Sequence, residues 1–196
     1  MHGGNRLNLQ FNRAERSHIE SIIDAFQEGF SASLQWQMNL FNRIWLLRAI
    51  KSPSCEIWVG RIRNETAGVL ILVNNYKGYL SFKKNLPMKL FYAACVFSPK
   101  VFLSLPRTVR ARKGVGSGEN VTLKYAFQPK PGPRRSLSLE QIVVRTQYRG
   151  QGIANNLVAF AKERAKEEGF SDISLMVNRK NRPAYNLYLK NGFSSG

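Results

Sequence analysis

Cysteine, histidine and acidic residues are all scarce in this chain of 196 residues. The two cysteines, Cys55 and Cys95, lie far apart and form no redox or metal-binding motif, and His2 and His18 are the only histidines. We therefore expect no metal site. Two isolated thiols are typical of a protein in a reducing compartment, so the sequence predicts a cytoplasmic location.

Long apolar runs are also missing. The longest, Leu90 to Phe97, is far shorter than the ~20 residues that a membrane-spanning helix requires. Residues Met1 to Arg6 lead into no apolar stretch, so no secretory signal is expected. Hydrophobic residues make up 43% of the chain and charged residues 21%, as in globular proteins. Together, length and composition predict a single folded domain over residues 1–196.

Positive charge is present in large excess. The chain has 30 Lys and Arg against 12 Asp and Glu, a formal net charge of +18. Residues 83–135 hold twelve of the basic residues and one acidic residue, Glu119. Such a segment attracts anionic partners, so contact with nucleic acid, a membrane surface or a phosphorylated substrate is predicted. Two interpretations of residues 83–135 stay open: a lid whose charges are merely solvated, and a surface that docks an anionic partner.

A strand, a tight turn and a helix are predicted in succession in the last third of the chain. Leu137–Val144 is an apolar run with β-branched residues at its end, as in a buried strand. Gly150 and Gly152 then permit positive φ, and apolar residues recur at helical spacing from Ile153 onward. Free N–H groups at a helix start bind phosphate. The turn is neither a Rossmann fingerprint, which needs a third small residue, nor a Walker loop, which needs Gly-Lys-Ser/Thr.

The segment Gln147–Gly152, with the sequence Gln-Tyr-Arg-Gly-Gln-Gly, resembles motif A of the GNAT superfamily of acyl-CoA N-acyltransferases. That motif reads Gln/Arg-x-x-Gly-x-Gly/Ala. The segment Asn181–Phe193 resembles the second signature of the family, Asn-x-x-Ala-x-x-x-Tyr-x-Lys-x-Gly-Phe. The positions that agree are Asn181, Ala184, Tyr188, Lys190, Gly192 and Phe193. The resemblance is close over about residues 137–193 and looser upstream.

This resemblance implies an α/β fold with a mixed, splayed central sheet and helices on both faces. The local patterns predict strands over 6–12, 56–63, 68–73, 121–127, 137–144 and 172–177, and helices over 17–29, 33–50, 90–97, 100–113, 153–169 and 181–193. The basic segment at about 83–135 is an insertion after the third strand. Members of the family continue past the Gly-Phe pair into two strands that cover the sheet edge. Because this chain lacks them, either the sequence is truncated or another segment covers the edge at 173–177. An uncovered edge would predict a homodimer or strand exchange there, or weak stability.

The resemblance also assigns a site for acetyl-CoA as acyl donor, with no metal. Backbone groups of Ile142, Val143 and Val144 would hold the pantetheine arm, and the Val144 N–H is the candidate oxyanion donor. The diphosphate would lie on the turn formed by Gln147, Arg149, Gly150, Gln151, Gly152, Ile153 and Ala154, with Asn181 assisting. Tyr188 is the candidate general acid for the leaving thiolate. A purely packing role beside Leu187 is the alternative for Tyr188.

Glu140 is the candidate general base, and it competes with a plain hydrogen-bonding role in the strand and with deprotonation of the amine through water. Trp36 and Trp45 either line an acceptor groove beside the first two helices or belong to the core. The predicted function is acetyl-CoA-dependent N-acetylation of a primary amine on a small-molecule or macromolecular acceptor. The macromolecular acceptors considered are aminoacyl-tRNA and a lysine of a basic protein beside RNA. The alternative is an inactive module that binds cofactor or another anion on a truncated fold of the family.

Overall fold

The computed structural model describes residues 8–29, 39–79, 120–127 and 134–195, and the elements below refer to these ranges. In chain order they are β1 (Gln10–Arg13), η1 (Arg16–His18), α1 (Ile19–Gly29), α3 (Asn39–Ala49), β2 (Cys55–Ile62), β3 (Glu65–Val73), β4 (Asn120–Ala126), β5 (Ser136–Val144), η2 (Thr146–Tyr148), α7 (Ile153–Glu167), β6 (Asp172–Asn178), α8 (Arg182–Lys190) and β7 (Ser194–Ser195). The predicted helices 90–97 and 100–113, most of the basic segment 83–135, Trp36 and Cys95 lie outside these ranges.

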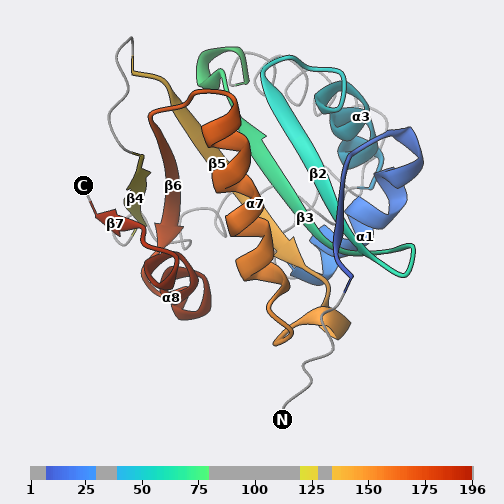
Figure 1. Cartoon of the computed structure of the whole chain (residues 1–196). Coiled ribbons are helices and arrows are strands. Elements are labelled where there is room, and N and C mark those ends of the chain that lie inside the picture. Colours follow the sequence, from blue (N-terminus) through green and yellow to red (C-terminus); the bar gives the residue numbers. More distant parts are fainter. Residues whose placement is uncertain (1–7, 30–38, 80–119, 128–133, 196) are drawn as a thin grey trace, which may run out of the picture.

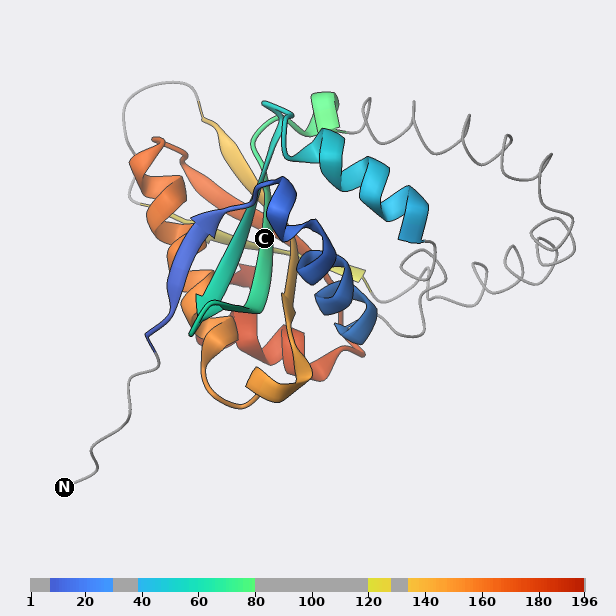
Figure 2. The same cartoon turned by 90° about the vertical axis from the view of Figure 1, so that its right-hand side faces the viewer.

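Seven strands form one mixed sheet in the order β1-β2-β3-β5-β6-β4-β7, which confirms the predicted α/β class (Figure 1). Only β5 and β6 pair in parallel. Helix α7 covers one face of the sheet with α8 beside its lower end, and α1 and α3 cover the other face (Figures 1 and 2). Each face has its own apolar core. Strand β3 is buried from Thr66 to Val73 because both faces are covered there.

The predicted hairpin between the second and third strands is confirmed, with a tighter turn than expected. Strands β2 and β3 pair from Cys55↔Val73 to Ile62↔Glu65, so only Arg63 and Asn64 connect them. Both residues have positive φ, 48° and 69°. Two successive residues of positive φ are typical of the type I′ turn, whose twist matches that of the flanking strands. Within this hairpin, Gly68 lies under α7, where an added Cβ would be 2.9 Å from Leu157 Cδ1.

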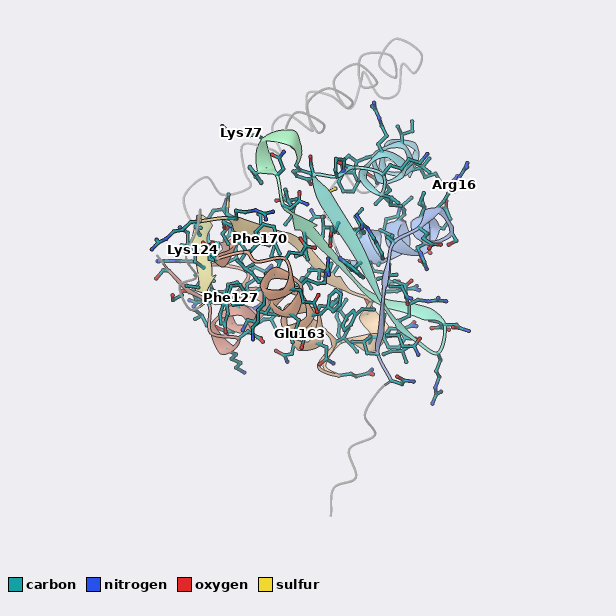
Figure 3. The ribbon with its side chains drawn as sticks, turned by 45° about the horizontal axis from the view of Figure 1, so that its top comes forward. Arg16, Lys77, Lys124, Phe127, Glu163 and Phe170 are labelled. Atoms are coloured by element: carbon teal, nitrogen blue, oxygen red, sulfur yellow. The ribbon has the colours of Figure 1, made fainter. Side chains whose placement is uncertain are left out.

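Of the two alternatives for the edge of β6, an uncovered edge is wrong and cover by another segment is confirmed. Strand β4 pairs antiparallel with β6 along its whole length, from Asn120↔Asn178 to Ala126↔Asp172, and β7 pairs with β4. Figure 3 shows Lys124 of β4, and Phe127 just after this strand, on the opposite side of the molecule from Arg16 of η1. The local pattern predicted a strand at 121–127, but strand partners some fifty residues apart leave no local signal. The reason for expecting a homodimer through this edge is therefore gone.

A partly buried cation connects β4 to the two helices of the α7 face. The Lys162 ammonium lies 3.8 Å from the centroid of the Tyr125 ring and donates a hydrogen bond to the Asn191 carbonyl. The Tyr125 ring in turn contacts the Phe193 ring, with centroids 5.6 Å apart. Burial lowers the pKa of Lys162, so the contacts with Tyr125 and Asn191 offset a desolvation cost. Lys162 thus joins α7, β4 and the end of α8.

We expect Lys162→Met to lower the free energy of unfolding by about 1 kcal/mol, because methionine keeps the apolar stem but loses the cation–π contact and the hydrogen bond. Urea denaturation measures this. Lys166→Met on the exposed side of the same helix is the matched control and should be nearly neutral. Equal effects of the two substitutions would show that the Lys162 contacts add nothing.

Candidate active site

The glycine turn lies between the end of β5 and the start of α7. Gly150 has φ 75° and Gly152 has φ 81°, and Gly152 is the N-cap residue of α7. Glycine adopts these angles at no steric cost, which explains both glycines of the motif. A Cβ added to either residue would meet nothing within 4 Å, so this side of the turn is open. The predicted strand–turn–helix arrangement is confirmed.

The backbone amides of the turn are available to a ligand. Within the described part of the chain, none of the N–H groups of residues 150–155 has a hydrogen-bond partner, and the first bond into α7 runs from Asn156 N to Gly152 O at 3.1 Å. Unpaired amides at a helix start carry the positive end of the helix dipole. Successive N–H groups of this kind bind phosphate oxygens. The turn is therefore suited to an anionic ligand held by main-chain donors.

Several side chains of the motif are used within the protein. Gln147 Nε2 and the Tyr148 hydroxyl both donate to Glu65 Oε2, at 3.1 and 2.6 Å. The bond to Glu65 raises the pKa of Tyr148. Arg149 Nε donates to Val144 O at 3.2 Å, and Gln151 Nε2 donates to Gln147 O at 2.9 Å. These side chains brace the turn, which leaves its backbone as the part free to bind a ligand.

Strands β5 and β6 pair at only three positions, Ser136↔Asp172, Leu137↔Ile173 and Ser138↔Ser174. Beyond Ser138 the two strands have no further pairing, as the predicted splay requires. The open end of the splay lies beside the start of α7 and beside α8 (Figure 1). An extended ligand arm entering this gap would find the edge of β5 on one side and that of β6 on the other.

The free edge of β5 presents backbone groups to this gap. Val144 and Val143 pair with Gly68 and Val69 of β3, and Arg145 N donates to Ala67 O at 3.0 Å. Because neighbouring residues of a strand direct their N–H and C=O groups to opposite edges, the groups of Val144 face away from β3. The same alternation directs the groups of Ile142 to the open edge, while the Val143 side chain is buried.

Helix α8 begins as predicted, with Asn181 as its N-cap and Pro183 in the first turn. Asn181 Oδ1 accepts a hydrogen bond from Ala184 N at 3.4 Å. Tyr188 is only 7% exposed and lies edge-on to Phe193, with ring centroids 5.7 Å apart. Burial raises the pKa of Tyr188 to about 12. Its hydroxyl has no hydrogen-bond partner among the described residues.

Glu140 lies at an irregularity of β5. The register with β3 passes from Ile71↔Gln141 to Leu72↔Leu139, so it shifts by one residue at Glu140, as in a β-bulge. Burial is the main cause of the raised pKa values of Tyr76 and Tyr79, and the negative charge of Glu140 raises both values further. Tyr79 belongs to the core beneath α1 and α3, whereas Tyr188 belongs to the core beneath α7. Leu139 also belongs to the core beneath α7, and successive strand residues alternate between faces. Together these observations indicate that the two candidate catalytic residues lie on opposite faces of the sheet.

A comparison with known proteins agrees with this geometry. Residues 122–193, which contain the turn, the splay and α8, match the model of the Acetyltransferase (GNAT) family. The chain belongs to the GNAT superfamily. It is 29% identical over 188 residues to N-acetyltransferase 8B of Rattus norvegicus, across 90% of this chain and 82% of that protein. It is 44% identical over 59 residues to streptothricin acetyltransferase of Escherichia coli, across 30% of this chain and 34% of that protein.

A solved structure shares the fold. The predicted acetyltransferase of Clostridium acetobutylicum superposes with a TM-score of 0.55 and 12% sequence identity, over 96% of this chain and 91% of that chain. The fold and the family together make this GNAT protein an acyl-CoA N-acyltransferase, and its relatives indicate acetyl transfer. The seven-stranded sheet differs from the expectation for the family at one edge, where β4 and β7 provide the outer strands.

Two carboxylates beside the GNAT turn were missed in the sequence. Glu28, near the end of α1, accepts hydrogen bonds from Arg145 Nε and Thr146 N, both at 2.9 Å. Glu65, the first residue of β3, holds Gln147 and Tyr148. Both contacts join positions more than eighty residues apart, so no local spacing signals them. The only available sign was, for Glu28, an acid close to the end of a predicted helix.

Other features of the described residues of the GNAT chain lie away from the turn. A cavity of about 770 Å³ lies between η1 and the end of α3, with Arg16, Leu47 and Ile50 in its wall. Trp45 packs against the core beneath α1 and α3, in agreement with a core role. Over the described residues, no group of three or more metal-ligating side chains occurs, and no helix is long and apolar enough to cross a membrane.

Proposed function

We propose that this protein transfers the acetyl group of acetyl-CoA to a primary amine by direct attack, with Tyr188 as general acid. The observation that carries the proposal is the row of unpartnered amides at residues 150–155 at the mouth of the β5–β6 splay. A diphosphate on these amides places the attached pantetheine arm at the gap between the two strands. The solved neighbour from Clostridium acetobutylicum is described as a complex with acetyl-CoA, which supports the same donor here.

The backbone of β5 would orient the donor. The open-edge groups of Ile142 are suited to pair with the amides of the pantetheine arm as an added strand would, whereas the Val144 carbonyl already accepts a hydrogen bond from Arg149 Nε. The N–H of Val144 then donates to the carbonyl oxygen of the thioester, where negative charge develops during attack. Bound acetyl-CoA supplies the activated acetyl group. Asn181 is assigned a supporting role in donor binding from the start of α8.

Tyr188 would supply the proton or hydrogen bond that the departing sulfur requires. The C–N bond forms as the C–S bond breaks, and the sulfur gains negative charge that a phenol O–H stabilises. With its pKa raised to about 12, Tyr188 stays protonated over the whole physiological range and is always a competent donor. Its buried position on the α7 side of the sheet leaves the opposite side to the acceptor.

Glu140 remains our candidate base, because it lies on the α1 and α3 side, from which the acceptor would then approach. The acceptor itself is proposed to be a primary amine on a small or macromolecular partner. The relative from Escherichia coli is named for acetylation of streptothricin, which favours a small-molecule acceptor. The net charge of +18 favours an acceptor with anionic character. An inactive module on a truncated fold is less well supported, since β4 and β7 complete the sheet edge.

A thermal-shift screen tests the donor. We expect acetyl-CoA and CoA to raise the melting temperature far more than NAD or ATP, because a ligand at a hundred times its Kd adds about 2.7 kcal/mol of stability. Release of free CoA thiol in the presence of a panel of primary amines, anionic ones included, then identifies the acceptor. Absence of any CoA-dependent shift would overturn the proposal.

A further inference from the structure

The last turn of α1 forms hydrogen bonds with residues 145–149, the segment that leads into the glycine turn. The Glu28 carboxylate accepts from Arg145 Nε at 2.9 Å and lies 2.8 Å from Arg145 Nη2. Its other oxygen accepts from the Thr146 amide at 2.9 Å. Arg149 Nη2 also donates to the Glu28 carbonyl, at 3.5 Å. One residue of α1 therefore contacts three residues of the 145–149 segment.

The contact between Glu28 and Arg145 stabilises the charged form of both side chains. The hydrogen bond from Arg145 lowers the pKa of Glu28, and the same bond raises the pKa of Arg145. The two side chains are 31% and 24% exposed, so the pair is partly shielded from water. The C-terminal end of α1 carries the negative end of its helix dipole, which favours the two arginines that approach it. Glu28 is thus ionised and paired at neutral pH.

The same end of α1 touches β5 directly. A Cβ added to Gly29 would come within 2.2 Å of Val143 Cγ2, so the backbone of α1 packs against the strand at a distance that only glycine allows. Glu28 and Gly29 therefore fix the end of α1 against β5 and the 145–149 segment together. This contact brings α1, which lies on the side of the sheet proposed for the acceptor, next to the glycine turn proposed to bind acetyl-CoA.

A carboxylate beside a site for an anion is unfavourable unless it performs another task. Anion binding by backbone amides depends on their being held in converging directions before the ligand arrives. We propose that Glu28 is a positioning residue for the acyl donor: by holding Arg145, Thr146 and Arg149 it orients the amides of residues 150–155 toward the diphosphate. This inference rests on the proposed binding of CoA at the turn.

Glu28→Gln tests the inference, because glutamine keeps the shape but loses the charge that pairs with Arg145. Isothermal titration calorimetry of the full chain should show CoA binding about tenfold weaker than in the wild type. Competition with pantetheine, which lacks the diphosphate, should give an affinity unchanged within about twofold. Glu28→Asp, which keeps the charge, should recover part of the loss. The matched control is Glu20→Gln, on the same helix, which removes an exposed ion pair with Arg43 and should change neither affinity.

Each outcome separates the inference from the proposed function. If the wild-type protein does not bind CoA, the proposed function fails and the role of Glu28 fails with it. If the wild type binds CoA but Glu28→Gln binds equally well, only the role of Glu28 is overturned. Parallel losses for CoA and pantetheine would assign Glu28 to general stability instead of diphosphate binding, and would also overturn the inference.

Discussion

Replacing Tyr188 by phenylalanine is expected to lower kcat for acetyl transfer about a hundredfold while leaving the Kd for CoA within about twofold. The ring would keep its packing on Phe193 and only the hydroxyl would be lost. A positioned general acid contributes about 10²- to 10⁴-fold to a rate, and the low end of that range is expected here because a thiolate is already a fairly good leaving group. Steady-state kinetics with the acceptor found in the screen, together with calorimetry, measure both quantities.

Tyr185→Phe on the same helix is the matched control, because Tyr185 is only partly buried beside the same core. The Tyr185→Phe variant should have a kcat within about twofold of the wild-type value. A second readout is the pH profile: since burial raises the pKa of Tyr188 to about 12, the wild-type rate should show no fall on the alkaline side up to about pH 10.5. The idea of an acid role would be abandoned if Tyr188→Phe retained full kcat.

The substitution Gly152→Ala is expected to weaken CoA binding about a hundredfold. At φ 81° an alanine is strained, and relief of that strain turns the neighbouring amides away from a shared ligand. Its methyl group also projects into the open side of the turn, where nothing of the protein lies within 4 Å. Loss of one to two hydrogen bonds to a charged ligand corresponds to roughly this factor, at ~1.4 kcal/mol per tenfold. Calorimetry with CoA measures it.

Gly169 offers a control for this prediction. It has φ 73°, and a Cβ there would likewise meet nothing within 4 Å, but it lies beyond the other end of α7. Gly169→Ala should therefore cost a similar ~1–2 kcal/mol of stability without affecting CoA affinity. An equal loss of affinity in both variants would trace the effect to strain in α7 and not to the diphosphate site.

The sequence predicted the parts of this protein whose signals are local. The two glycines of the turn, the apolar run of β5, the cap Asn181 with Pro183 and the left-handed Gly169 each constrain only their own neighbourhood, and all took the expected conformation. The splay of β5 from β6 followed from the family resemblance, not from the residues. It is present in the structure as three paired positions and no more.

The features that were wrong or missed all depend on contacts between distant segments. Strand β4 was expected as a strand, but its place beside β6 depends on which free edge is left when the rest of the sheet has formed. Glu28 and Glu65 reach the turn from α1 and β3, and a carboxylate on an exposed helix end has the same local appearance whether or not it has a distant partner. The bulge at Glu140 likewise arises from pairing with β3.

During synthesis of the chain, β4 emerges well before the strands with which it pairs. Its seven residues leave the ribosome before β5, α7 and β6, yet it pairs along its length with β6, some fifty residues later, and with β7, which comes later still. At translation rates of about 5–20 residues per second, β4 waits roughly 3–10 s with both edges unsatisfied. During that interval nascent chains on neighbouring ribosomes could pair through it. Lys124, exposed in the middle of the strand, supplies the kind of charge that discourages such mispairing.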